Sequence, residues 1–182
     1  MTERQIQCAL FREFRSTSSL VIPNYSPAGY WQCDLWRVTK AGYAEEYEIK
    51  LTVADFKQDA QKFMKSRTVE KTPDGKRIRV LLETRKHELV EAGGGPNRFW
   101  YVAPSGLLSI DMIPSWAGLR EVTRHGNWLR VGTTKRAPEL HKRQADQKVI
   151  EHAQSVFYWR FWGERLKNVE LRKKLLDTNM QT

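Results

Sequence analysis

The residues Glu48, Ile49 and Lys50 place an acid and a lysine two positions apart, a spacing that can serve metal-dependent hydrolysis. In a β-strand, residues two apart project from the same side. A carboxylate that binds a cation would then lie beside an ammonium that stabilises developing negative charge. The pattern is also common by chance, because charged residues make up about a quarter of ordinary chains. Its structural setting therefore has to decide its meaning.

The same pattern of acid, any residue and lysine occurs at three further places, namely residues 55–57, 74–76 and 146–148. Asp55 follows Thr52 by three residues, a spacing typical of a helix start, and helix positions two apart face different directions. The segment "TPDGK" predicts a turn, and residues 146–148 fall in a predicted helix. Only Glu48-Ile49-Lys50 is expected to present its acid and lysine from one side of a strand.

Three β-like runs surround this pattern, at residues 19–25, 30–38 and 43–51, with turn-forming segments at 26–29 and 40–42 between them. They predict an antiparallel meander of three strands. Alternation along the third strand places Tyr47 and Ile49 on one face, and Glu46, Glu48 and Lys50 on the other.

The other predicted elements are a helix at 2–15, a helix from 53 to 64, a buried strand at 97–104, and further short strands at 107–132. Residues 138–176 fit either one long helix or two shorter helices broken at Gly163. Residues 69–80 fit either a basic hairpin around Pro73-Asp74-Gly75 or a loop into a helix at 77–92. We predict a domain at 1–138 and a C-terminal helical extension at 139–182, packed on the domain or on a partner subunit.

In the first predicted helix, Glu13 falls among the apolar residues at about 100° per residue. A carboxylate pointed at a core is costly unless it is paired or bound. Three explanations remain open at this point: an irregular apolar face, a salt bridge with an arginine, or a helix that leans over a metal site.

The charge balance of the 182-residue chain favours a polyanionic partner. It has 31 Lys and Arg against 21 Asp and Glu, a net charge of +10. Nucleic acid is the first expectation and an anionic membrane surface the second, beside the alternative of a soluble protein that is simply basic.

Membrane and disulfide classes are disfavoured by the sequence. No run approaches the roughly 18 apolar residues of a spanning helix, and "MTERQIQCALFREFR" has no signal-peptide core. Cys8 and Cys33 have no companions at zinc spacing, and two cysteines cannot form a disulfide framework. We expect an intracellular, reducing location and no membrane partner.

Asp34, on the second predicted strand, is expected beside Glu48 and Lys50 on the third. Converging carboxylates repel each other unless a cation lies between them. Oxygen ligands without Cys or His nearby select Mg²⁺ or Mn²⁺, which can activate a water toward a phosphodiester. Lys50 could steady that water or the pentacovalent phosphorane.

The order of a helix, a meander carrying Asp34 and then Glu48-Ile49-Lys50, and a following helix resembles the PD-(D/E)XK nuclease superfamily. The segments "EIKLTVADFKQD", "NRFWYVAPSGLL", "IPSWAGL" and "TKRAPELH" resemble its MmcB-type DNA-repair branch and phage-encoded relatives. In that branch a strand Glu and Lys precede a helix with a Ser/Thr-x-x-Asp-Phe start, and an aromatic strand ends in a proline loop. The resemblance spans roughly residues 1–145.

The resemblance implies an α/β (α+β) fold with a restriction-endonuclease-like core of helix, three-strand antiparallel meander, helix and strand. It implies metal ligation by Asp34, Glu48 and the backbone carbonyl of Ile49, with Lys50 as catalytic lysine and Mg²⁺ or Mn²⁺ as cofactor. Glu13 and Glu46 are candidate supporting residues. Candidate DNA contacts, chosen by charge and expected exposure, are Lys57, Lys65, Arg67, Lys76, Arg77 and Arg79.

The leading hypothesis is thus a metal-dependent DNA endonuclease of DNA repair or phage DNA processing, in the cytoplasm of a bacterial or phage-infected cell. The alternative is a non-catalytic DNA-binding or repair-adaptor protein that keeps the nuclease fold. RNA cleavage stays open, because the metal chemistry does not choose the sugar. Cutting both strands of a duplex is simplest for a homodimer, which the aromatic residues 157–162 could build.

Overall fold

The computed structural model describes residues 1–27, 31–72 and 74–179. The chain forms two compact units, Met1–Ala145 and Asp146–Thr182. The first unit therefore extends seven residues beyond the predicted boundary at residue 138. Part of the turn predicted at residues 26–29, and Pro73 of the "TPDGK" turn, lie outside the described residues.

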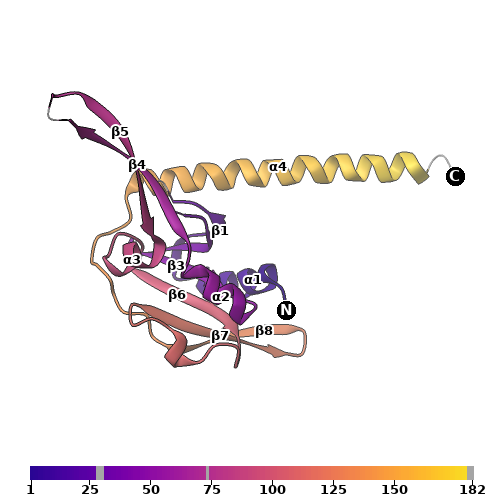
Figure 1. Ribbon diagram of the computed structural model, residues 1–182. Coiled ribbons are helices and arrows are strands. Elements are labelled where there is room, and N and C mark those ends of the chain that lie inside the picture. The colour runs from indigo at the N-terminus through magenta and orange to yellow at the C-terminus, as the bar shows by residue number, and fades with distance from the viewer. Residues whose placement is uncertain (28–30, 73, 180–182) are drawn as a thin grey trace. The chain divides into compact units, whose positions relative to one another are not determined.

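The first unit is built on a six-stranded mixed sheet in the order β1-β2-β3-β6-β7-β8 (Figure 1). Its strands are β1 (Ser18–Tyr25), β2 (Cys33–Thr39), β3 (Ala44–Ile49), β6 (Arg98–Pro104), β7 (Ala117–His125) and β8 (Trp128–Lys135). The predicted antiparallel meander of β1, β2 and β3 is confirmed. β6 then runs parallel to β3, which requires the long crossover between them.

One face of the sheet is covered by α1 (Glu3–Phe14), whose first turn is capped by the Thr2 hydroxyl. Ile6, Leu10 and Phe14 recur at helical spacing and are buried in a cluster that includes Tyr47 and Trp100. The rings of Phe14 and Tyr47 lie 5.0 Å apart. This cluster takes up the apolar face of β3.

The opposite face is covered by residues of the β3–β6 crossover. Val53 and Phe56 of α2 (Val53–Asp59) and Val90 of α3 (Lys86–Glu91) belong to a cluster with Phe99 and Tyr101 of β6. Thr52 caps α2 through the Asp55 N–H, at 3.1 Å, as its spacing predicted. Both faces of β3 are therefore covered.

The crossover also contains a hairpin of β4 (Phe63–Lys71) and β5 (Arg77–Arg85), which forms a two-stranded sheet of its own. The hairpin alternative is thus confirmed, and the helix predicted at 77–92 is wrong except for α3. The helix predicted to reach residue 64 also ends earlier, at Asp59. The segment "RIRV" alternates charged and apolar residues with period two, a pattern that favours a strand.

The segment 140–145, at the end of the first unit, is held to the rest of that unit by hydrogen bonds of the buried Asn97. Its side chain accepts a hydrogen bond from the Ala44 N–H at 2.8 Å and donates to the carbonyls of His141 and Arg143 at 2.7 and 2.8 Å. The Ala145 N–H donates to the Gly42 carbonyl. These bonds explain why the first unit continues past residue 138.

The second unit consists of the helix α4 (Gln147–Asn179). It is continuous through Gly163, so the alternative of one long helix is confirmed here and the alternative of two helices broken at Gly163 is wrong. Aromatic rings follow one another along it, with centroids 5.2 Å apart for Tyr158 and Trp159 and 5.7 Å apart for Phe161 and Trp162. Among the residues described, no helix is long and apolar enough to cross a membrane.

Gly118 of β7 is expected to be intolerant of a side chain. A Cβ there would lie 2.5 Å from the Trp100 ring and 2.6 Å from the Ala137 nitrogen. We predict that Gly118→Ala lowers the free energy of unfolding by about 1–3 kcal/mol, measured by urea denaturation. Gly132→Ala in β8, where nothing lies within 4 Å, is the matched control and should change little. Equal effects of the two substitutions would contradict the close packing.

Candidate functional site

The charged face of β3 is buried rather than solvated. Glu46, Glu48 and Lys50 expose 2%, 1% and 2% of their surface. Burying charges at this depth is costly unless each one is paired. The partners of these three residues therefore define the candidate site.

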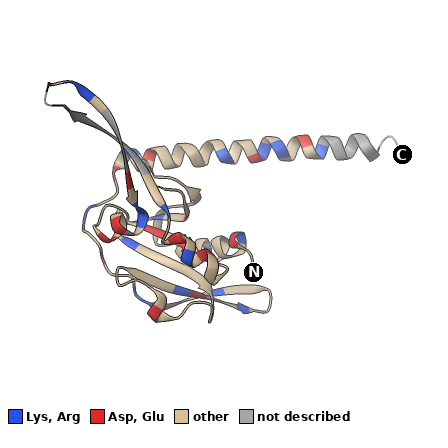
Figure 2. Ribbon diagram, in the orientation of Figure 1, with Lys and Arg blue, Asp and Glu red and all other residues tan. Residues whose placement is uncertain are grey.

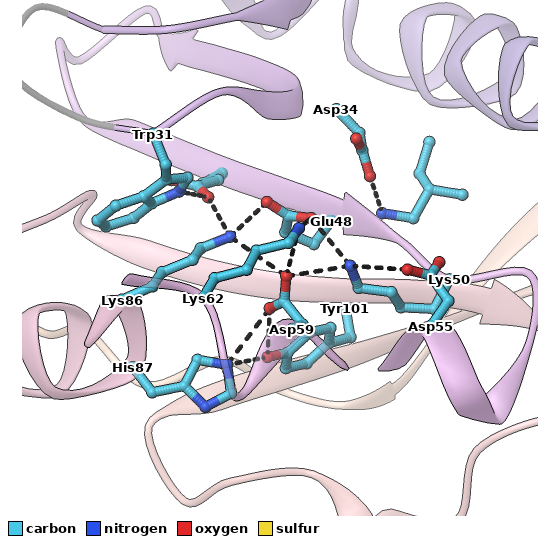
Figure 3. A network of polar contacts seen from close by, with 12 residues as sticks. Trp31, Asp34, Glu48, Lys50, Asp55, Asp59, Lys62, Lys86, His87 and Tyr101 are labelled. Atoms are coloured by element: carbon cyan, nitrogen blue, oxygen red, sulfur yellow. Dashed lines mark hydrogen bonds and ion pairs between the residues drawn. The ribbon is translucent and has the colours of Figure 1, made fainter. Parts of the chain in front are cut away.

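Glu48 is held by lysines at both of its carboxylate oxygens (Figure 3). Its Oε2 accepts a hydrogen bond from the Lys50 ammonium at 3.1 Å, and its Oε1 accepts one from Lys86, the first residue of α3. The Lys62 Nζ lies 3.8 Å from Oε2. The acid and lysine of the Glu48-Ile49-Lys50 pattern thus contact each other directly.

Asp59, the last residue of α2, is the second centre of the cluster. Its Oδ1 lies 3.1 Å from the Lys50 Nζ and 2.8 Å from the Lys62 Nζ. Its Oδ2 lies 3.1 Å from the Tyr101 hydroxyl and 3.3 Å from Nε2 of His87. Asp59 therefore joins the lysines to a His–Tyr pair on the neighbouring elements (Figure 3).

Lys86 lies among the acids as an internal counter-cation. Besides Glu48, its Nζ approaches Glu46 at 3.2 Å, and the Trp31 indole donates a hydrogen bond to the same Glu46. The ammonium also lies 5.0 Å from the Trp31 ring centroid and 4.9 Å from that of Phe99. Desolvated cation–π contacts of this kind add to the ionic attraction.

The pKa directions follow from these contacts. Burial lowers the pKa of Lys86, but the attraction of Glu46 and Glu48 outweighs it, so the pKa is raised above its ordinary value. Burial alone would raise the pKa of Asp59, but bonds from His87 and the nearby lysines hold it well below its usual range. Burial, followed by repulsion from Glu48, raises the pKa of Glu46 to about 7, although Lys86 opposes the shift.

Asp34 differs from the other carboxylates. The β2–β3 register pairs Leu35 with Tyr47, and extending it by one residue brings Asp34 opposite Glu48. Its Oδ2 accepts a hydrogen bond of 2.6 Å from the Ile49 N–H, and within the described residues it carries no ion pair with a lysine or arginine. Burial and the Glu48 charge raise its pKa from 3.8 to about 7. Asp34 is therefore a partly buried acid that forms no ion pair with a lysine or arginine among the described residues, although the Lys50 charge lowers its pKa slightly.

The Asp34–Glu48 edge offers carboxylate oxygens, the ligand class that hard divalent ions prefer. Among the described residues, no group of three or more His, Cys, Asp or Glu is placed to hold a metal. Mg²⁺ is commonly bound by one or two carboxylates plus water and substrate oxygens. Two lysines already bind Glu48, but each carboxylate oxygen can accept more than one partner.

Two partly exposed side chains, those of Lys62 and Asp55, contact the buried cluster. Lys62 is 47% exposed and touches both Glu48 and Asp59, whereas those two acids are almost fully buried. Asp55, 48% exposed, lies 3.9 Å from Lys50.

The two predicted supporting residues have different positions. Glu13 is not at the site, which corrects that expectation: its carboxylate pairs with Arg120 of β7, on the α1 side of the sheet. The alternative of a salt bridge with an arginine is confirmed. Glu46 does belong to the cluster, where it contacts Lys86 and Trp31.

The candidate DNA contacts lie on α2 and on the hairpin. Lys57, Lys76 and Arg77 are exposed, on α2, in the β4–β5 turn and at the start of β5. Lys65 and Arg67 of β4 and Arg79 of β5 are placed by their backbone register alone.

Five members of the cluster were not predicted from the sequence, namely Asp59, Lys62, Lys86, His87 and Tyr101. Asp59 was missed because the sequence predicted a helix that continues to residue 64, in which Asp59 would face away from the strand. Tyr101 could have been found, because it lies on an aromatic strand and pairs in register with Glu48. No sequence signal marks Lys86 and His87, whose positions depend on the path of the crossover.

Because the pKa of Asp34 is raised to about 7, we predict that the free energy of unfolding depends on pH. The native state holds this proton up to about pH 7, whereas the unfolded chain releases it near 3.8. As the pH rises through that window, the wild type should lose stability relative to Asp34→Asn, by up to about 1.4 kcal/mol per pH unit. Urea denaturation of both proteins in EDTA measures the difference. Parallel pH profiles would contradict the raised pKa.

Removal of the internal counter-cation should destabilise the fold. Lys86→Met leaves Glu46 and Glu48 buried with a missing partner, so we predict a loss of about 3–5 kcal/mol in the free energy of unfolding. Lys40→Met, at an exposed lysine, should change stability by no more than about 0.5 kcal/mol. A Lys86→Met loss as small as that of the control would show that the two acids do not depend on Lys86.

Comparisons with known proteins show the fold alone. No protein-family model matches the chain, and no curated protein matches it. Among solved structures it is similar to the SPO1766 protein of unknown function from Silicibacter pomeroyi, with a TM-score of 0.61 and 15% sequence identity, over 91% of this chain and 92% of that chain. The chain thus has a mixed α/β fold, with a mixed sheet and a C-terminal helix, that a solved structure shares.

Proposed function

We propose that this protein is a metal-dependent DNA endonuclease with a restriction-endonuclease-like core, related to the PD-(D/E)XK nucleases. One observation carries the proposal. Glu48 and Lys50 contact each other on a buried strand face, and Asp34, which forms no ion pair with a lysine or arginine among the described residues, lies opposite Glu48 on the neighbouring strand. A buried carboxylate next to another carboxylate favours a bound cation.

In this proposal Asp34, Glu48 and the backbone carbonyl of Ile49 would hold Mg²⁺ or Mn²⁺. The bound ion would supply Lewis-acid activation of a water and of a phosphodiester oxygen. Lys50 is oriented by Glu48 and Asp59, so that its ammonium is fixed where negative charge develops. The Ile49 N–H fixes the Asp34 carboxylate in turn.

The charge distribution supports a DNA partner. Glu46, Glu48 and Asp59 are matched by Lys50, Lys62 and Lys86 within the cluster, as the adjacent acidic and basic segments around β3 in Figure 2 illustrate. The net charge of +10 therefore belongs to the remainder of the chain. A surface with this excess attracts the phosphates that the acidic site itself would repel.

A second candidate function is DNA binding without cleavage, as in a repair adaptor. It is favoured by the lysines on both oxygens of Glu48, because Lys86 and Lys50 already neutralise one of the two carboxylates that a metal would use. In that case the cluster stabilises the fold, and DNA is bound elsewhere on the basic surface.

A nicking assay on supercoiled plasmid separates the two functions. With Mg²⁺ or Mn²⁺ the wild type should nick the plasmid, and EDTA should abolish nicking. Asp34→Asn is the sharpest variant, since it keeps an acceptor for the Ile49 N–H and breaks no ion pair among the described residues. We predict that it cleaves at least about 100-fold more slowly, with DNA affinity in EDTA unchanged or higher.

Lys40→Ala, an exposed lysine, is the control for a small loss of positive charge and should cleave as the wild type does. Binding of DNA with no nicking under any metal would refute the nuclease and leave the adaptor. Cleavage of a labelled RNA but not of plasmid would refute the choice of DNA.

A further inference from the structure

The β4–β5 hairpin has two faces of different composition. Its register is unbroken from the pair Phe63–Arg85 to the pair Lys71–Arg77. In an antiparallel pair, directly opposite residues share a face, and so do alternate residues along each strand. All odd-numbered positions of both strands therefore lie on one face, and all even-numbered positions on the other.

Every lysine and arginine of the two strands lies on the odd-numbered face. They are Lys65, Arg67, Lys71, Arg77, Arg79 and Arg85. We call this the basic face. The even-numbered positions form the neutral face and are Met64, Ser66, Thr68, Glu70, Ile78, Val80, Leu82 and Thr84. Each face holds one acid, Glu83 on the basic face and Glu70 on the neutral one.

Near the base of the hairpin, the basic face is the more exposed of the two. Phe63 is 54% exposed and Arg85 is also exposed, with its guanidinium 5.7 Å from the Phe63 ring centroid. Met64 and Thr84, which pair with each other on the neutral face, are half-buried. At the other end Arg77 is exposed. The basic face is therefore available to a partner at both ends.

An ordinary solvated strand face mixes charges of both signs, which keeps its field small. By backbone register, six basic positions and one acidic position share this side of the ribbon, an excess of positive charge that a mixed strand face would lack. Charges that only protect strand edges from pairing have no reason to lie on one face, because the unpaired groups of an edge lie in the plane of the sheet. The segregation points to a polyanion that approaches from one side.

Duplex DNA is the polyanion that fits this shape. The major groove of B-DNA admits a two-stranded β-ribbon, whereas the major groove of duplex RNA is too narrow and deep to enter. Same-face residues along a strand repeat about every 6.8 Å, close to two base-pair steps of about 3.4 Å. Cations on both strands can then meet phosphates at regular intervals along the groove.

We propose that the basic face of the β4–β5 hairpin binds the phosphates of duplex DNA, with the ribbon lying along the major groove. The inference rests on the proposed DNA partner and adds the element, the face and the form of nucleic acid that it takes. It does not depend on whether the acidic cluster cleaves.

A face-exchange variant tests the proposal without altering composition or net charge. Arg67→Thr, Thr68→Arg, Arg79→Val and Val80→Arg together move two cations from the basic to the neutral face. Binding of a labelled DNA duplex is measured in EDTA over a range of salt concentrations. The plot of log affinity against log salt should become less steep by about 0.9 for each phosphate that the hairpin no longer neutralises, about 1.8 in total.

A neutralised variant, Arg67→Gln with Arg79→Gln, should show the same decrease in slope, and decides the matter if the face-exchange variant does not fold. Its control, Thr68→Gln with Leu82→Gln on the neutral face, should bind as the wild type does. If the face-exchange variant bound duplex DNA with the affinity and salt slope of the wild type, the proposal would be overturned, because net charge alone would then account for binding. Equal competition by duplex RNA would overturn the groove assignment.

The two proposals fail separately. Absence of metal-dependent nicking, with the salt slope still dependent on the basic face, would refute the nuclease and keep the hairpin as a DNA-binding element. Nicking by the wild type together with an unchanged slope in both hairpin variants would refute the hairpin and keep the nuclease.

Discussion

Charge balance on one side of β3 is the constraint on which the rest of this structure depends. Glu46, Glu48 and Lys50 are buried on a strand segment that is covered on both faces. Glu48 and Lys50 pair with each other, so the remaining partners have to come from other elements. Asp59 arrives at the end of α2 and Lys86 at the start of α3. An unpaired buried charge costs several kcal/mol. The ionic contacts therefore hold both ends of the hairpin-containing crossover against the sheet, and they limit the paths that the chain can take between β3 and β6.

Neighbouring carboxylates in this region have opposite pKa shifts, and the difference comes from their surroundings. Asp59 is surrounded by lysines and by His87 and remains ionised, whereas burial and the repulsion of Glu48 raise the pKa of Asp34 to about 7 against the hydrogen bond from the Ile49 N–H. Pairs of acids whose environments separate their pKa values are typical of sites that perform acid–base or metal chemistry. Glu48 belongs to both surroundings. A change in the charge of Glu48 would therefore alter both the ion pairs of the lysine cluster and the pKa of Asp34.

The sequence predicted the parts of the site that depend on local periodicity. The alternation of β3 placed Glu48 and Lys50 on one face, the spacing from Thr52 to Asp55 predicted the start of α2, and turn-forming residues separated the strands of the meander. Residues brought in by the crossover could not be predicted, because the position of Lys86 depends on where α2 stops and on how far the hairpin extends. Glu13 was misplaced for a related reason. Helical periodicity assigned it to the sheet side of α1, but it does not reveal that Arg120 would come from a strand more than a hundred residues later.

The Asn97 side chain links the beginning of β3 to the segment that precedes α4. Mechanically, this amide connects the start of the strand that carries the acidic cluster to the residues just before the C-terminal helix. Tension applied to α4 would pass through residues 140–145 and be resisted first by hydrogen bonds at Gly42 and Asn97, which involve residues at the start of β3 and β6. A partner that held α4 would therefore pull on the strand of the candidate site through only a few residues of chain.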